Sequence, residues 1–286
     1  MDRENEDLEA VNWAMQLSAA TAAQRWPLWK SFCLHPQPQR LLTALRQQPV
    51  IAHYPELQAL IGVKQNPVYH PEGDVWTHTL LVCAYAATHA IARGFSEEKR
   101  VRLLLACLCH DIGKAPTTKV TNGKLTSRGH SNVGYDLSKT FLRERLGLGD
   151  QETIDAVANL VKDHLFHLDG AAINKKAIGR LQKRLVPATI EELVFLIEAD
   201  ASGRPPLPQG RPANADKMLS LVDDDPAPRA PELISGQDII DLGVAEGPRC
   251  GHYLTLVREK TASGELQSRS QALDYLRSLI SSDDKK

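Results

Sequence analysis

A histidine and an aspartate, His110 and Asp111, follow an almost entirely apolar run at residues 101–109. The run has the composition of a buried helix, in which imidazole and carboxylate groups are uncommon. Burying both groups costs several kcal/mol unless each finds a partner. A divalent cation is the natural partner, because it accepts a neutral ring nitrogen as well as an anionic oxygen. The sequence therefore predicts a metal site here, provided that further ligands converge on the pair.

Helical periodicity dominates the rest of the chain. Aromatic residues make up only 5% of the sequence, and the sustained alternation of apolar and polar residues that marks β-strands is rare. We therefore predict an all-α protein, in which Trp13, Trp26 and Trp29 act as packing anchors near the N-terminus. The expected helices cover residues 8–29 (as one or two helices), 38–47, 74–93, 97–111, 132–146, 150–164, 174–185, 189–200, 235–242, 248–260 and 268–278.

Composition and charge limit the classes of function. The formal net charge is −1, which argues against tight non-specific binding to DNA but leaves room for a local basic groove. The basic stretch at residues 175–184 is typical of a solvated helix face, and a weak contact with RNA is its alternative interpretation. The apolar runs are far too short to span a membrane, and the acidic N-terminus has no signal-peptide layout, so we expect a cytoplasmic protein. The five cysteines lack the spacing of a disulfide framework, and Cys107 and Cys109 are expected to pack inside a helix.

Other polar residues at the ends of apolar segments complete a candidate metal site with the His110–Asp111 pair. His78 has apolar neighbours on both sides in a long helical pattern, and Asp200 ends the last strongly apolar one. Two imidazoles and two carboxylates suit Mn, Fe, Co, Ni or Mg better than a closed structural zinc site. His130 and His164 lie at helix ends, where they either bind a second metal ion or hold a phosphate and donate a proton.

The order of these residues resembles the HD superfamily of metal-dependent phosphohydrolases. The match is closer still to the HD domain of bacterial CCA-adding tRNA nucleotidyltransferases, and it extends over residues 38–276. The segments that carry the resemblance are residues 66–80, 108–114, 129–130 and 199–204, with residues 231–240 and 247–248 in the tail. The resemblance implies an HD-domain helical core with a small helical C-terminal module. The resemblance divides this chain into an N-terminal helical segment (1–66), an HD phosphohydrolase domain (67–204) and a Pro-rich loop with the C-terminal module (205–286).

One departure from that family limits the expected activity. A nucleotidyltransferase head needs a glycine-rich loop and paired carboxylates on strands, and residues 1–60 contain no glycine and no strand pattern. Asp223 and Asp225 are spaced like such a pair, but their Pro-rich surroundings are typical of a solvated turn. The resemblance therefore implies the HD activity alone. That activity is a phosphohydrolase acting on 2′-phosphates, 2′,3′-cyclic phosphates and related nucleotide esters, including those at RNA or tRNA ends.

Site roles follow from the same resemblance. One or two divalent ions would be held by His78, His110, Asp111, Asp200, His130 and His164. Asp111, His130 and Lys114 are the expected catalytic residues, and Lys114, His164 and Arg204 are expected to bind the substrate phosphate. Lys114 has an alternative interpretation as a cation at a helix C-terminus.

Other histidines and other functions complete the set of hypotheses. We interpret the remaining histidines as surface or loop residues, with His70 and His167 the nearest to a motif. An HD-type di-iron oxygenase and a non-catalytic RNA-binding HD module are the alternative functions. Iron with O₂ consumption would favour the first, and RNA binding that survives chelation, without turnover, would favour the second.

Overall fold

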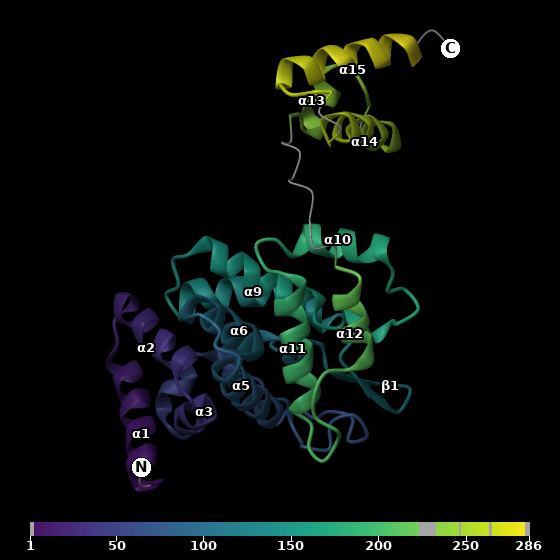
Figure 1. Cartoon of the computed structure of the whole chain (residues 1–286). Helices are drawn as coiled ribbons and strands as arrows, with labels where there is room; N and C mark the ends of the chain where they lie inside the picture. The colour runs from purple at the N-terminus through teal and green to yellow at the C-terminus, as the bar shows by residue number, and fades with distance from the viewer. Residues whose placement is uncertain (1–2, 223–232, 246, 263–264, 284–286) are drawn as a thin grey trace. The chain divides into compact units, whose positions relative to one another are not determined.

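The computed structural model describes residues 3–222, 233–245, 247–262 and 265–283, which are largely helical (Figure 1). The predicted all-α fold is confirmed, with one short hairpin as the β-structure in these ranges. The elements are α1 (Arg3–Ala19), α2 (Ala22–Leu34), α3 (Pro38–Gln47), η1 (Pro49–His53), α4 (Pro55–Gln58), α5 (Val75–Ala92), α6 (Glu97–Cys109), α7 (Lys114–Thr117), β1 (Lys119–Thr121), β2 (Lys124–Thr126), α8 (His130–Thr140), η2 (Phe141–Arg145), α9 (Gln151–Asp163), η3 (Phe166–Leu168), α10 (Lys175–Leu185), α11 (Ile190–Ser202), α12 (Ala213–Ser220), α13 (Gly236–Asp241), α14 (Pro248–Ala262) and α15 (Arg269–Asp283).

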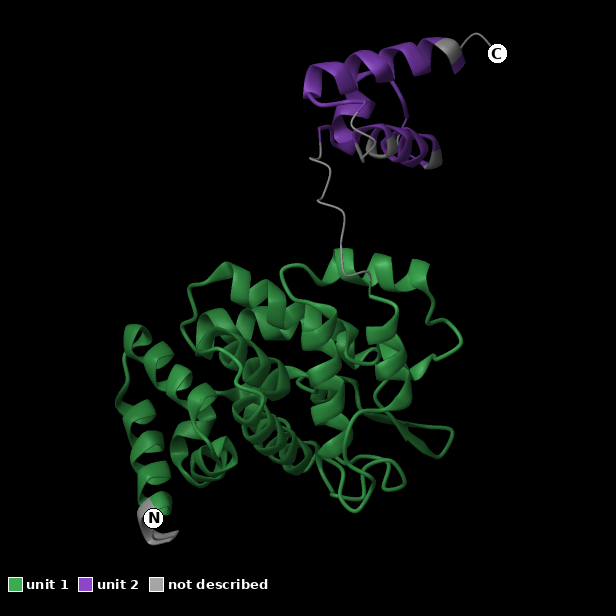
Figure 2. Cartoon of the chain, in the orientation of Figure 1, with its two compact units in different colours: residues 1–222 green, residues 223–286 purple. Residues whose placement is uncertain are grey.

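The chain divides into two compact units, residues 1–222 and residues 223–286 (Figure 2). The second unit has its own small core, in which Ile239, Tyr253 and Leu276 from α13, α14 and α15 are buried. The predicted domain boundaries at 66/67 and 204/205 both fall inside the first unit and remain predictions about domains. Asp223 and Asp225 lie outside the described residues.

Aromatic side chains hold the N-terminal helices against the rest of the first unit. Trp29 is fully buried, and its ring lies edge-on to Trp13 and Tyr54 at centroid distances of 5.3 and 5.2 Å. Its indole N–H donates to the Tyr54 hydroxyl at 3.2 Å, so the buried polar group of the ring has a hydrogen-bond partner. The predicted packing role is confirmed for Trp13 and Trp29, and Trp26 packs partly buried against the same core.

Helices α5, α6, α9 and α11 form the centre of this unit (Figure 1). All residues of α6 from Leu103 to Cys109 are buried, which explains their apolar sequence. Both Cys107 and Cys109 pack there as free thiols, as predicted. Side-chain caps start these helices: Asp74 accepts from the Thr77 backbone N–H at α5. The Ser96, Asp150 and Thr189 side chains cap α6, α9 and α11 in the same way.

The hairpin, α12 and the short helices η1, α4, α7 and η3 were not expected from the sequence. Strands β1 and β2 pair antiparallel, with Lys119 opposite Thr126, around a turn in which Asn122 and Gly123 both have positive φ. Such a two-residue Asn-Gly turn matches the twist of a hairpin, so the dipeptide was the available signal. Three-residue strands are too short to show alternation. Helix α12 was not expected either, because its eight residues directly follow a Pro-rich segment.

Within the described residues, the helices are too short or too polar to cross a membrane.

Candidate metal centre

The structure brings together all six predicted metal-binding side chains, from five helices of the first unit. We call this set the six-residue centre. Five of the six residues are buried, and the Asp200 side chain is only 13% exposed. The six are His78 within α5, His110 and Asp111 directly after α6, His130 at the start of α8, His164 directly after α9, and Asp200 within α11.

His78, His110 and Asp200 form the first half of the centre. The His78 Nε2 atom lies 3.1 Å from Asp200 Oδ1 and 3.2 Å from His110 Nε2. Asp111 Oδ2 lies 3.3 Å from His110 Nε2 and 3.8 Å from His78 Nε2. Two ring nitrogens and two carboxylates therefore face one small volume.

Asp111, His130 and His164 form the second half. Asp111 Oδ1 lies 3.3 Å from His130 Nε2 and 3.9 Å from His164 Nε2. The two ring nitrogens are 3.3 Å apart. Asp111 thus turns one oxygen toward each half, which is the arrangement of a carboxylate that bridges two adjacent sites.

The four imidazoles share one orientation. Each Nδ1 atom lies against an oxygen acceptor, so each neutral ring carries its proton on Nδ1 and keeps a lone pair on Nε2. The acceptors are Glu72 Oε1 at 2.8 Å and the Gly203 carbonyl at 3.2 Å for His78, the Cys107 carbonyl at 2.8 Å for His110, the Ser127 carbonyl at 2.8 Å for His130 and the Val161 carbonyl at 2.6 Å for His164. The four Nε2 atoms consequently face the carboxylates, and each offers a lone pair when it carries no proton.

The electrostatics of the centre follow from burial and close partners. Burial raises the pKa of Asp111, but the Lys114 ammonium and the His110 ring outweigh it and hold that pKa well below its usual range. Burial lowers the pKa of His78, but hydrogen bonds with Asp200 and Glu72 reverse the shift and raise it to about 9. Burial and the neighbouring His110 lower the pKa of His164 to about 3. The carboxylates therefore stay ionised. The additional proton on His78 gives this ring a positive charge next to them.

Divalent metal ions fit this donor set. Two Nε2 atoms only 3.2 or 3.3 Å apart require a cation, either a proton or a metal ion, near both. Asp111 Oδ2 is buried and accepts no well-formed hydrogen bond among the described residues, although the Lys114 ammonium lies 2.7 Å away. Imidazole nitrogens and carboxylate oxygens together are typical ligands of Mn, Fe, Co and Ni. A metal ion would replace the proton between His78 Nε2 and Asp200 Oδ1.

A close backbone approach positions the two halves. Gly113 lies two residues after Asp111, and a Cβ atom on it would lie 2.1 Å from the His130 carbonyl oxygen. Glycine is therefore required for the turn after α6 to pack against the start of α8. This contact explains why Gly113 stands in the motif.

A pocket of about 490 Å³ opens above the centre. Asp111, His130, His164 and Asp200 line its floor, and the walls carry basic side chains. These are Lys64, Lys114, Arg128 and Arg204. The two predicted phosphate-binding cations, Lys114 and Arg204, therefore both reach the pocket.

Lys114 lies beside the metal-binding residues. It is the first residue of the four-residue helix α7, five positions after the end of α6. It is 8% exposed, and its ammonium lies 2.7 Å from Asp111 Oδ2 and 2.7 Å from Gln65 Oε1. These contacts favour its predicted role in the site over that of a helix C-terminal cation, and both stay predictions.

Two histidines that the sequence analysis interpreted as surface or loop residues near a motif, His70 and His167, also line the pocket. His70 is half-buried, and its Nδ1 atom lies 2.8 Å from Glu72 Oε1. His167 is buried, and its Nδ1 atom lies 3.2 Å from the His164 carbonyl. The sequence signal for a role of His70 and His167 in the site was their position close to His78 and His164 along the chain. Glu72 was missed altogether, because it follows a proline in a loop with no periodic pattern.

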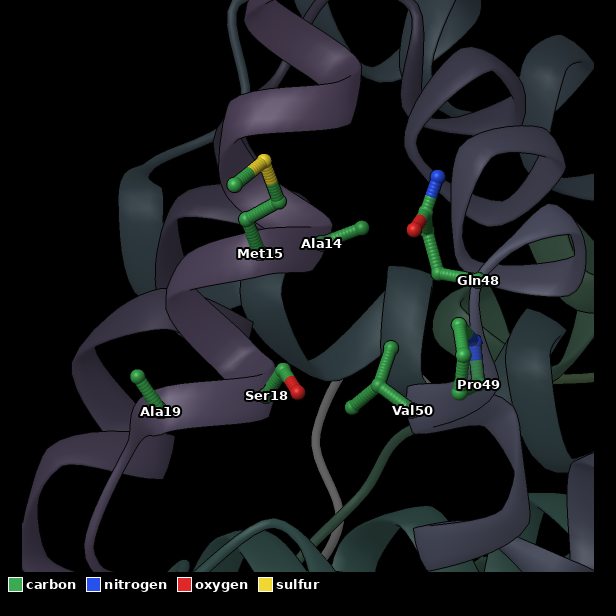
Figure 3. Close-up of a pocket in the computed structure, with 7 residues that line it drawn as sticks. All are labelled: Ala14, Met15, Ser18, Ala19, Gln48, Pro49 and Val50. Atoms are coloured by element: carbon green, nitrogen blue, oxygen red, sulfur yellow. The ribbon is translucent and has the colours of Figure 1, made fainter.

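A second hollow, of about 330 Å³, lies between α1 and the connection from α3 to η1 (Figure 3). Ser18 and Gln48 supply its polar side chains, and the others are apolar, among them Met15 and Val50. None of the seven lining residues is titratable. This hollow offers no ligand set for a metal and no charge for a phosphate.

Comparisons with known proteins place this geometry in a family. The family model of the HD domain matches residues 75–203, the segment that contains all six residues of the centre. The CC-adding tRNA nucleotidyltransferase of Thermus thermophilus is 30% identical over 236 residues, which are 78% of this chain and 49% of that protein. The multifunctional CCA protein of Pseudomonas fluorescens is 31% identical over 253 residues, 86% of this chain and 56% of the relative. The multifunctional CCA protein of Vibrio vulnificus is 38% identical over 210 residues, 69% and 47% respectively.

The chain spans about half the length of these curated relatives. HD domains form a superfamily of metal-dependent phosphohydrolases, and the buried histidine and aspartate clusters fit the binding of divalent metal ions. The resemblance drawn from the sequence is therefore confirmed at the level of the family. Residues 75–203 of this chain match the HD domain family, and the chain is similar over 69–86% of its length to a CC-adding tRNA nucleotidyltransferase and to multifunctional CCA proteins.

Proposed function

We propose that this protein hydrolyses nucleotide phosphate esters in a divalent-metal-dependent reaction. The substrates are 2′-phosphates or 2′,3′-cyclic phosphates, free or at the end of an RNA. One observation carries the proposal: four imidazoles and two carboxylates converge, and four of the six residues (Asp111, His130, His164 and Asp200) line a pocket with basic side chains. A phosphate ester needs both features, because its charge must be neutralised and a water molecule must be activated.

The two halves of the centre would each hold one cation. His78, His110 and Asp200 would bind the first, and His130 and His164 the second, with Asp111 shared between them. The orientation of His164 favours a metal over a phosphate. Its Nδ1 proton is engaged by the Val161 carbonyl, so Nε2 presents a lone pair, which a phosphate oxygen would repel.

Bound divalent ions would polarise a phosphoryl oxygen and lower the pKa of a bound water. The chain's own residues supply the rest. The Lys114 ammonium, beside Asp111 at the pocket floor, would neutralise charge that develops on the phosphoryl oxygens. The half-buried Arg204 guanidinium, at the pocket wall, would hold a second oxygen through its planar donor fork.

An RNA end is a substrate that the relatives suggest. The proteins similar to this chain are named for tRNA nucleotide addition. The exposed basic residues of α10, among them Lys176 and Arg180, would offer a weak contact to an RNA backbone. Free nucleotides require no such contact, so both kinds of substrate belong in one assay.

The test is release of phosphate from 2′-AMP and opening of 2′,3′-cyclic AMP by the purified protein with Ni²⁺, Mn²⁺ or Co²⁺. Asp111→Ala is expected to abolish turnover, because it removes the carboxylate shared by both halves. Asp136→Ala, an exposed aspartate on α8, is the matched control and should keep full activity. Turnover that survives Asp111→Ala would refute the assignment. Iron content with O₂ consumption and no phosphate release would instead favour an oxygenase.

A further inference from the structure

Glu72 is a buried carboxylate directly beside the six-residue centre. It lies in the segment between α4 and α5, and its side chain is only 1% exposed. One oxygen, Oε1, lies 2.8 Å from His70 Nδ1 and also 2.8 Å from His78 Nδ1. The other oxygen, Oε2, is buried without a hydrogen-bond partner among the described residues.

The surroundings of Glu72 differ from those of the other buried glutamates. Glu192 is paired with Arg102 at 2.9 Å, and Glu198 with Arg211 at 3.1 Å. The ion pairs that the structure describes for Glu72 involve only the two imidazoles. Burial raises the pKa of Glu72, but hydrogen bonds with the two imidazoles outweigh it and lower that pKa to about 2, so Glu72 is an ionised partner of both rings.

The shared oxygen fixes the proton on both rings. An ionised carboxylate only accepts hydrogen bonds, so both rings donate to it from Nδ1, and His78 Nδ1 also lies 3.2 Å from the Gly203 carbonyl. The His78 Nε2 atom faces Asp200 Oδ1 at 3.1 Å, where a metal ion would take the place of its proton. Carboxylate–histidine pairs of this kind orient metal-binding rings and raise their basicity.

The second ring, His70, lies next to Lys114, the cation that is expected to bind the substrate phosphate. His70 Nε2 lies 3.5 Å from the Lys114 ammonium. The same ammonium lies 2.7 Å from Gln65 Oε1 and 2.7 Å from Asp111 Oδ2. The Gln65 oxygen and the His70 ring thus face the ammonium as acceptors and Asp111 as its ion-pair partner, which holds it at the wall of the pocket.

We propose that Glu72 is a positioning residue with two effects. It holds the His78 ring in the form that binds metal, and through His70 it holds Lys114 where the phosphate binds. One carboxylate outside the metal-binding set therefore serves both the metal and the substrate cation. The inference rests on the proposed function, and its first arm is tested without any turnover.

That first arm is the metal affinity of the purified, metal-free full chain. Mn²⁺ binding is followed by electron paramagnetic resonance, and the Co²⁺ absorption spectrum reports on the ligand geometry. Glu72→Ala should weaken binding by about 10- to 100-fold, the usual effect of removing such a partner. Glu72→Gln should weaken it less, because the amide oxygen still accepts hydrogen bonds but carries no charge. Both variants should alter the Co²⁺ spectrum.

A matched control separates positioning from general destabilisation. Glu192→Gln changes an equally buried glutamate, at the opposite end of α11 from Asp200, and should leave metal affinity and the Co²⁺ spectrum unchanged. Circular dichroism and denaturant unfolding confirm that each variant is folded. If Glu72→Ala does not fold, the isosteric Glu72→Gln still decides the question through its spectrum and affinity.

The second arm separates the two effects of Glu72. His70→Ala should leave Mn²⁺ affinity unchanged and weaken inhibition by inorganic phosphate by about three- to tenfold, the effect of one lost hydrogen-bond partner. A wild-type protein that binds no divalent metal would overturn the proposed function itself. Wild-type binding with equal affinity in both Glu72 variants would overturn only the positioning role. Unchanged phosphate inhibition in His70→Ala would overturn the link to Lys114.

Discussion

The aromatic layer under the N-terminal helices and the six-residue centre are both buried in the same unit, but they have opposite compositions. We define the aromatic layer as Trp13, Trp29, Phe32, Tyr54 and Phe141. Its rings remove apolar surface from water, and its two indole N–H groups have acceptors. The centre instead buries two carboxylates and four imidazoles, which stabilise the fold only when a cation compensates them. Truncation should therefore harm the first region most, and cation binding should affect only the second.

The largest loss of stability is expected from Trp29→Ala in the aromatic layer. Trp29 is fully buried and contacts four other rings, so truncation leaves a cavity. Such substitutions cost about 3–5 kcal/mol of unfolding free energy. Denaturant titration measures the loss, and Mn²⁺ affinity of the folded variant should stay unchanged. A loss below about 1 kcal/mol would contradict the role given to this layer.

Metal binding gives the next largest effect. Mn²⁺ at one hundred times its dissociation constant should raise the unfolding free energy by about 2.7 kcal/mol relative to the metal-free protein. The same addition to His110→Ala, which lacks a ligand of the first half, should raise it far less. Thermal and denaturant unfolding with and without a chelator measure both values. Equal stabilisation of the two proteins would place the bound metal elsewhere.

Asp74→Ala tests a residue that links stability to the centre. Asp74 caps α5 and accepts hydrogen bonds from the Thr77 N–H, the Thr77 hydroxyl and the Gly62 N–H. Loss of such a cap costs about 1 kcal/mol. Asp74→Asn keeps an acceptor and should cost less, which denaturant unfolding can resolve. Equal losses in the two variants would show that the cap is not the cause.

The same carboxylate predicts a pH dependence. Burial raises the pKa of Asp74, but hydrogen bonds from Thr77 and Gly62 outweigh it and lower that pKa below its usual value. The contribution of Asp74 to stability is therefore present above about pH 4 and is lost as the pH falls through its lowered pKa in the folded state. The difference in unfolding free energy between wild type and Asp74→Ala should shrink at low pH. A difference that grows with acid would have the wrong sign.

The smallest effect is expected on the exposed face of α10. Lys176→Ala removes an exposed charge outside both regions and should change the unfolding free energy by at most about 0.5 kcal/mol. If α10 contacts RNA, the variant should also bind a tRNA more weakly and reduce the salt slope by about one. An unchanged slope would leave α10 as a solvated face.

Sequence reasoning located the helices and the six residues of the centre, because both leave local signals. A polar pair after an apolar run, as at His110 and Asp111, is visible without a structure, and so are capping residues such as Asp74 and Ser96. The roles of the six residues remain predictions. Sequence reasoning missed Glu72 and His70, because they act through contacts with groups on other segments and have no periodic pattern. Helix α12 was missed because the preceding prolines hid it.

The most direct test of the central claim is equilibrium dialysis of the metal-free protein against Mn²⁺. The account predicts saturable binding of one or two ions per chain by wild type and by Asp136→Ala. It predicts that Asp111→Ala, which removes the carboxylate facing both halves, loses most of this binding. The claim that His110 and Asp111 bind metal would be contradicted by either of two results. One is wild-type protein without saturable binding, and the other is undiminished binding by Asp111→Ala.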